Sequence, residues 1–304
     1  MNTLCSLDDS QDDKIDFAKK TAPLCILLAG IMWGTMGLFV RKLNALGLAT
    51  MNIVALRIFC TSIILSIFCL AFDRSVFYVR FKDLWCFFGT GIASIIFFNF
   101  CYFKTITLTS LSVAAVLLYT APSIVMLLSL FLFKEKITFR KILAAAFAFV
   151  GCVLVSLDGG GDNKVSVTAI FTGLGAGFGY ALYTIFGRYA LCKGYSSLAV
   201  TLWTFFFACF GILPFADLPL IFSVSIQSSN IILFVVLFAM IATVLPYILY
   251  TFGLVHVDGG KASVISSVEP AAAAILGILV FSEPVTIPGV AGILLVLFSI
   301  FLLS

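Results

Sequence analysis

The sequence predicts an all-α integral membrane protein with ten transmembrane helices, arranged as two inverted five-helix repeats. The first observation is composition: 62% of the 304 residues are hydrophobic and 11% are charged, a balance unlike that of a water-soluble globule. The second is the grouping of apolar residues into ten runs, each near the roughly 20 residues that cross a hydrocarbon core. The third is an internal match between the two halves of the chain, which predicts the repeats.

Short polar connections join the ten spans and leave no room for a soluble domain. Residues 1–21 are polar and largely acidic, so we expect a cytoplasmic N-terminal tail and no cleaved signal peptide, which would be basic there. The first repeat is expected over residues 22–157 and the second over residues 166–304. The expected spans are residues 22–40, 50–72, 83–103, 110–133, 139–157, 166–187, 196–215, 229–253, 261–281 and 286–303.

The repeat is visible as identical residues at a fixed spacing. Identical residues recur at an offset of 148 residues, among them Pro122 with Pro270 and Glu135 with Glu283. Further upstream the matches continue with one residue of slip. Because each unit has an odd number of spans, the second copy must cross the membrane in the opposite sense, which predicts an inverted repeat.

The basic residues predict the orientation in the membrane. With the N-terminus in the cytoplasm, 13 Lys and Arg lie in cytoplasmic segments and 4 on the other side. The positive-inside rule therefore places both termini in the cytoplasm. These residues are scattered and form no basic tract interleaved with aromatic residues, so the lipid bilayer is an expected partner and nucleic acid is not.

The cysteine and histidine residues do not form the patterns of a metal or cofactor site. The nine cysteines form no Cys-x-x-Cys pair and the chain has one histidine, His256, so we expect no metal site and no cofactor. We interpret the cysteines as packed thiols and His256 as an interfacial residue.

Glycines at helical spacing predict close helix crossings. The glycine-rich start of the sixth span lacks the Gly-x-Gly-x-x-Gly spacing of a dinucleotide loop. Gly173 and Gly177 instead form a small-xxx-small pattern, which lets helix backbones approach closely. Gly30 and Gly34 repeat this pattern in the first span, so the two helices are expected to play equivalent structural roles.

Glu269 is the foremost candidate for a functional residue. It is the only acid well inside an apolar run, and an intramembrane carboxylate costs about 2.5–3.5 kcal/mol, so such a residue usually faces a cavity. Pro270 loosens the helix beside it, and Thr120-Ala121-Pro122 is the equivalent segment of the first repeat. Desolvation disfavours a charged carboxyl group, which makes protons a candidate coupling ion. The alternative is a structural hydrogen bond to a neighbouring helix.

Aromatic residues with a polar tip are the other candidates for a binding cavity. Tyr180 and Tyr183 are three residues apart, as are Tyr247 and Tyr250, so each pair shares a helix face. Such faces would suit an amphipathic solute or an organic cation, although any single ring has lipid contact or packing as its alternative. The remaining candidates are Trp33, Asn99, Tyr102 and Tyr119.

Three further charged residues receive structural interpretations. Arg57 lies about one turn past the expected membrane edge, where we expect it to reach the interface or fix a neighbouring helix end. Contact with an anionic substrate is its alternative. Glu135 and Glu283 begin equivalent loops and are interpreted as caps of the following helices or as loop contacts.

The order and spacing of these motifs resemble one transporter family. They are Met32-Trp33-Gly34, Thr120-Ala121-Pro122 followed by Lys134-Glu135-Lys136, and Glu269-Pro270 followed by Ser282-Glu283-Pro284. Together with the two five-helix copies, they resemble the EamA family of the drug/metabolite transporter superfamily from about residue 22 onward. The resemblance implies a secondary carrier with alternating access, a central cavity built by helices 1, 3, 4, 6, 8 and 9, and, in many members, export of amino acids or related metabolites. By position it places on cavity helices Trp33, Asn99, Tyr102, Tyr119, Tyr180, Tyr183, Tyr247, Tyr250 and Glu269.

We therefore expect a secondary active transporter of a small-molecule substrate in the cytoplasmic (inner) membrane, foremost an exporter of amino acids or related amphipathic solutes. No nucleotide-binding motif is present, so an ion or solute gradient would drive it. An importer of a quaternary ammonium such as choline is the alternative within transport. Outside transport, the alternatives are a non-transporting scaffold or an intramembrane enzyme. An enzyme would usually need paired carboxylates, a His/Ser arrangement or metal ligands, whereas this sequence offers a single intramembrane acid. Substrate, direction and oligomeric state stay open, a homodimer included.

Overall fold

The computed structural model describes residues 5–109, 111–156, 166–226, 228–282 and 284–303, and these residues are all-helical, with no strand among them. The first half contains α1 (Cys5–Gly34), α2 (Met36–Ala45), α3 (Thr50–Phe72), η1 (Arg74–Phe77), η2 (Phe81–Asp83), α4 (Leu84–Phe88), η3 (Gly89–Ile96), α5 (Phe97–Leu108), α6 (Leu111–Leu118), α7 (Ala121–Phe133) and α8 (Phe139–Ser156). The second half contains α9 (Val167–Cys192), α10 (Ser197–Ile212), η5 (Leu213–Phe215), α11 (Leu218–Ser225), α12 (Ser229–Ala239), η6 (Met240–Val244), α13 (Leu245–His256), α14 (Gly259–Ser266), α15 (Glu269–Phe281) and α16 (Ile287–Phe301).

Nine helical segments in the described ranges are long and apolar enough to cross a membrane. The run expected as the tenth span is α16, whose 15 residues rise only about 22 Å. Within the segment expected as an N-terminal tail, α1 begins at Cys5, and no glycine or proline interrupts this helix before Pro23. The connection after the seventh span also contains a short helix, α11, which begins with Pro219 in its first turn and is capped by Asp217.

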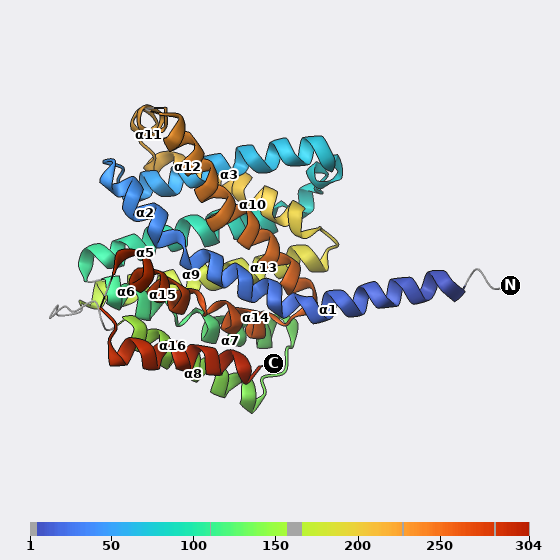
Figure 1. Cartoon of the computed structure of the whole chain (residues 1–304). Coiled ribbons are helices and arrows are strands. Elements are labelled where there is room, and N and C mark those ends of the chain that lie inside the picture. Colours follow the sequence, from blue (N-terminus) through green and yellow to red (C-terminus); the bar gives the residue numbers. More distant parts are fainter. Residues whose placement is uncertain (1–4, 110, 157–165, 227, 283, 304) are drawn as a thin grey trace.

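Successive spans connect at alternating ends of the molecule. The connections that lead into α4, α8, α10 and α14 lie at the right-hand end of Figure 1, where α1 joins the body. The connections after α2, α5 and α15 lie at the opposite end. As a result, α1 and α9, the first helices of the two halves, run in opposite directions (Figure 1).

The first helix of each half packs against helices of the other half. The long helix α1 packs against α13, α14 and α15 of the second half, and α9 packs against α5, α6 and α7 of the first. This exchange interlocks the two halves in the middle of the molecule, where the candidate residues lie.

Glycines allow α1 and α9 to cross the helices of the opposite half at short backbone distances. A Cβ atom added to Gly34 of α1 would lie 2.8 Å from the backbone oxygen of Glu269, and one added to Gly30 would lie 2.9 Å from that of Ser266. A Cβ atom added to Gly177 of α9 would lie 2.7 Å from Oγ1 of Thr120. The predicted close crossings are therefore confirmed, and each one covers the Pro-containing segment of the opposite half.

The two halves also share unusual backbone features. Lys134 and Ser282 both have a φ of 54°, and Gly47 and Gly194 both have a φ of 89°. In the glycine pair, the residue after each glycine donates its N–H to a carbonyl five residues back, which closes equivalent helix ends. The π-helical segments η3 and η6 also occupy corresponding places before α5 and α13. These features fit a chain of two repeats.

Candidate functional site

Two transmembrane helices are broken at corresponding positions. The fourth apolar run divides into α6 and α7 around Tyr119 and Thr120, and the ninth divides into α14 and α15 around Ser267 and Val268. In each case a proline stands in the first turn of the second helix, where it lacks an N–H to continue the preceding helix. Irregular backbone at membrane depth occurs where it is packed in protein or lines a cavity, and here α1 and α9 cover it.

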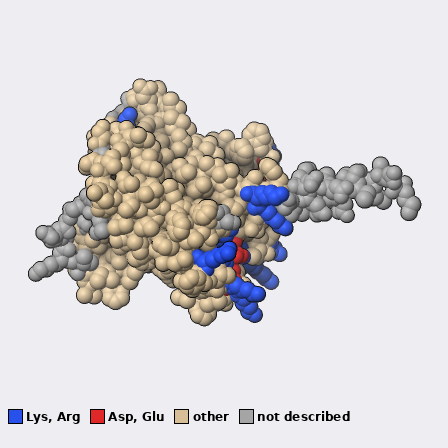
Figure 2. Space-filling model, turned by 60° about the horizontal axis from the view of Figure 1, so that its bottom comes forward, with Lys and Arg blue, Asp and Glu red and all other residues tan. Residues whose placement is uncertain are grey.

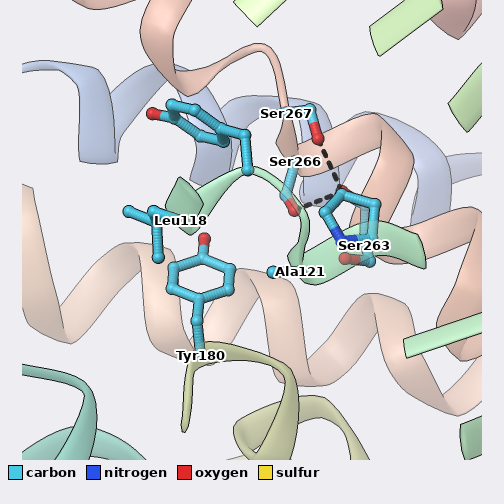
Figure 3. Close-up of a pocket in the computed structure, with 8 residues that line it drawn as sticks. Leu118, Ala121, Tyr180, Ser263, Ser266 and Ser267 are labelled. Atoms are coloured by element: carbon cyan, nitrogen blue, oxygen red, sulfur yellow. Dashed lines mark hydrogen bonds between the residues drawn. The ribbon is translucent and has the colours of Figure 1, made fainter. Parts of the chain in front are cut away.

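A small pocket lies between the two breaks. It is lined from one side by Leu118, Tyr119, Ala121 and Pro122, from the other by Ser263, Ser266 and Ser267, and also by Tyr180. Figure 3 shows the hydroxyl of Tyr180 pointing into this pocket. The hydroxyls of Ser266 and Ser267 donate to the carbonyl oxygen of Ser263 at 2.9 and 3.1 Å (Figure 3). The side-chain oxygen of Ser263 is buried and has no hydrogen-bond partner, so the pocket offers an unused polar atom.

Glu269 is the first residue of α15 and is bonded from α9. The hydroxyl of Tyr180 donates to Oε2 of Glu269 at 3.2 Å, a long distance for this kind of hydrogen bond. The half-buried carboxylate lies at a helix N-terminus, where the helix dipole favours negative charge. It therefore keeps most of its capacity to accept a hydrogen bond from a cationic group.

A second pocket on the other side of Tyr180 has aromatic walls. The ring centroid of Trp33 lies 5.2 Å from that of Tyr247, 5.3 Å from that of Tyr250 and 6.5 Å from that of Tyr180. The ring of Tyr183 lies 5.0 Å from that of Tyr247, nearly perpendicular to it. The lining consists of Trp33, Ser94, Ile95, Phe98, Tyr180, Tyr183, Thr184, Tyr247 and Tyr250.

Two of the tyrosine hydroxyls join helices across this pocket. Tyr183 shares a hydrogen bond of 2.9 Å with Thr251, and Tyr250 shares one of 2.7 Å with Thr184. Both bonds link α9 to α13 and fix the orientation of the rings. Tyr180 is different, because its hydroxyl bonds the acid and its ring lines both pockets.

The site is closed in this conformation. The cavity volume is about 10 Å³ in the first pocket and about 20 Å³ in the second, enough for one water molecule. Any organic solute would need the helices around Tyr180 to move apart.

The other sequence candidates lie around this site without all facing it. Tyr119 lines the first pocket, and the ring of Tyr102 packs 5.7 Å from that of Phe98. Asn99 is buried, but its amide donates to the carbonyl oxygen of Ile95 in its own helix at 2.7 Å. The structure therefore does not bring the Asn99 side chain into either pocket.

Arg57 differs from its main sequence expectation. Its side chain is 3% exposed, so the interpretation as a residue reaching the membrane interface is wrong. It lies about two turns into α3, and Nη1 donates to Sδ of Met36 at 3.3 Å. The pocket residues Ser94, Phe98 and Thr184 were also missed, since nothing in the sequence distinguishes them from other apolar or small residues of these helices.

Ion pairs connect the polar loops at one end of the molecule. Glu135 pairs with Arg188 and accepts from the backbone N–H of Gly259 at 3.1 Å, so it caps α14 of the other half rather than the helix that follows it. Lys141 pairs with Asp258 at 2.8 Å. In Figure 2, most of the visible Lys and Arg side chains gather at one end of the molecule, around acidic side chains. Glu283, the matching acid of the second repeat, lies outside the described residues.

The helices and their buried polar site define a multi-pass membrane protein. The profile of the EamA-like transporter family matches residues 20–157 and again residues 167–304. The chain belongs to this family, and the resemblance found in the sequence is confirmed.

Relatives along most of the chain carry the same general description. The chain is 26% identical over 250 residues to the uncharacterized transporter YetK of Bacillus subtilis (strain 168), covering 81% of this chain and 76% of that protein. It is 25% identical over 286 residues to the uncharacterized inner membrane transporter YicL of Salmonella typhimurium (strain LT2), covering 92% and 94%. A crystal structure with 17% identity superimposes with a TM-score of 0.74 over 93% of this chain and 96% of that one, which supports the fold.

Proposed function

We propose that the protein is a secondary active transporter that works by alternating access and exports amino acids or related amphipathic solutes. The observation that carries this proposal is the carboxylate of Glu269, placed at a helix break between two interlocked halves and bonded only weakly by Tyr180. A substrate ammonium group would give this carboxylate a stronger, charge-assisted partner. The aromatic walls beside it would hold the apolar part of the solute.

The architecture that we propose has ten transmembrane helices, with α16 as the tenth, in two inverted repeats over residues 22–157 and 166–304. The opposite directions of α1 and α9 (Figure 1) and the equivalent helix ends support it. We further propose the cytoplasmic (inner) membrane as its location, with both termini in the cytoplasm, on the distribution of basic residues. Broken helices at the interface of such repeats are where secondary transporters bind substrate and coupling ions.

A quaternary ammonium importer is the second candidate. The rings of Trp33, Tyr180, Tyr247 and Tyr250 line one pocket, and π faces attract an organic cation that cannot donate hydrogen bonds. The two candidates differ in the charge that the substrate must carry: an amino acid presents an ammonium and a carboxylate, whereas choline presents a fixed positive charge alone.

The test is solute flux through purified protein in liposomes loaded with radiolabelled amino acids or choline. We expect amino-acid efflux above that of empty liposomes, and its loss in Glu269→Gln. Asp73→Asn, a matched acid-to-amide change on an exposed loop, is the control and should transport normally. Preference for choline over every amino acid would favour the second candidate, and absence of flux for the whole panel would contradict a transporter of this class.

A further inference from the structure

Arg57 is a buried charge whose hydrogen-bonding capacity is almost unused. A guanidinium carries five N–H donors, yet the described residues give it one hydrogen bond, to the thioether of Met36 at 3.3 Å. Thioether sulfur is a weak acceptor. The Nε atom is buried with no partner. Burying a charge in a membrane span is strongly disfavoured unless some other group supplies acceptors, so the structure leaves a role for such a group.

Met36 connects the side chain of Arg57 to the cluster that contains Trp33, one of the residues lining the aromatic pocket. The charge of Arg57 lies within electrostatic reach of the carboxylate of Glu269. Met36, its one hydrogen-bond partner, packs both against the core around α3 and against the cluster that contains Trp33. Arg57 is therefore next to the candidate site, although it comes from a helix that the family resemblance does not count among the cavity helices.

The contacts of Trp33 connect the surroundings of the two charges. Trp33 packs against Tyr180, which bonds Glu269, and it belongs to the cluster against which Met36, the partner of Arg57, also packs. Among the described residues, Arg57 and Glu269 form no direct ion pair, although each lies within electrostatic reach of the other. The site thus has a negative pole and a positive pole that do not satisfy one another.

We propose that Arg57 is a substrate-binding residue that holds the carboxylate of a zwitterionic substrate while Glu269 holds its ammonium group. This proposal rests on the proposed function and names its substrate class. A guanidinium matches a carboxylate through two parallel hydrogen bonds, which a lysine cannot reproduce. An amino acid would give both charges a partner, whereas a cation such as choline would leave Arg57 unpartnered.

A purely structural role for Arg57 makes a different prediction. If the guanidinium only balances the field of Glu269, removing it lowers stability and weakens binding of every ligand to a similar degree. If it binds the substrate carboxylate, removing it changes which ligands are preferred. The ratio of two affinities therefore separates the roles.

The experiment compares three matched ligands on the purified full-length protein: an amino acid, its amide, which lacks the carboxylate, and its N-acetyl derivative, which lacks the ammonium group. Phenylalanine and leucine supply the side chains. Ligand-induced thermal stabilisation gives the apparent Kd. Wild-type protein should bind the zwitterion about tenfold or more tightly than the amide. In Arg57→Gln this ratio should fall to near one, with Arg57→Lys between the two.

Arg74→Gln, which removes an exposed cation just beyond the same helix, should keep the wild-type ratio. An unchanged ratio in Arg57→Gln overturns the proposal. If that variant does not fold, the affinities of the wild-type protein are sufficient for the test. Equal affinity for the zwitterion and the amide would overturn the role of Arg57. That result would still be compatible with a transporter of cations. Stabilisation by none of the amino acids, amides or choline would overturn the proposed function as well.

Discussion

The carboxylate of Glu135 accepts a hydrogen bond from the backbone N–H of Gly259 at 3.1 Å. Glu135 follows α7 in the first half and Gly259 begins α14 in the second, so an acid of one half caps a helix of the other. Arg188 pairs with the same carboxylate, and Asp258, one residue before α14, pairs with Lys141. These contacts hold the two halves together at the end where the basic residues gather.

Substitution of Glu135 by Gln should destabilise the protein. The change keeps the shape of the side chain but removes the charge that pairs with Arg188 and favours the N-terminus of α14. We expect the free energy of unfolding to fall by roughly 1–3 kcal/mol, measured as a lower melting temperature of the purified protein in detergent. Lys136→Gln, an exposed charge next to it, is the control. Equal melting temperatures for the two variants would show that the cap contributes little.

The glycine crossing of α9 can be tested within one helix. A Cβ atom on Gly177 would lie 2.7 Å from Oγ1 of Thr120 and 3.0 Å from the backbone oxygen of Leu117, whereas one on Gly187 would meet nothing within 4 Å. Gly177→Ala should therefore lose roughly 1–3 kcal/mol through overpacking. Gly187→Ala should be neutral or gain up to about 1 kcal/mol, since alanine favours helix. Melting temperatures that shift in the same direction would contradict a close crossing at Gly177.

The orientation in the membrane stays a prediction that the equivalent turns make testable. Gly47 and Gly194 lie in matching turns of the two halves, at opposite ends of the molecule according to the alternation of the spans. An epitope inserted after Gly194 should be protected from antibody by the cytoplasmic membrane. An epitope inserted after Gly47 should bind antibody once the outer membrane or cell wall has been permeabilised. Accessibility of both epitopes would show that they lie on one side and would refute the inverted arrangement.

The features that sequence predicts best are those encoded by local chemistry. Pro23 lies within the unbroken α1, so a proline alone does not predict a break, but the match of Pro122 with Pro270 between the repeats indicates where two equivalent helices are weakened. The pattern of Gly30 and Gly34 likewise requires only helical spacing to predict a close crossing. Each of these features concerns the backbone, and the helical period is sufficient to place it.

Contacts between side chains of distant segments could not be predicted in the same way. Asn99 was expected in the cavity because of its helix, yet its amide bonds Ile95 one turn back. Arg57 was expected near the interface, yet it is buried and bonds Met36 of α2. Helices that are apolar on every side carry no amphipathic signal of which face points inward, so only the tertiary arrangement separates a cavity residue from a packed one.

The driving force of transport gives the last prediction, and Glu269 is the residue that decides it. If the same carboxyl group binds either a proton or the substrate ammonium, proton binding at the outside would release the substrate, and return of the protonated carrier would draw on the proton gradient. Glu269→Gln cannot titrate but keeps a carbonyl oxygen able to accept from Tyr180. In liposomes with an imposed pH gradient, this variant should lose gradient-driven net transport and retain part of the exchange measured with substrate on both sides. Loss of both activities would show that substrate binding itself requires the charge of Glu269, and would contradict a variant that fails only in proton coupling. If net transport and its pH dependence both match the wild type, Glu269 has no part in coupling, and the gradient must act through another group.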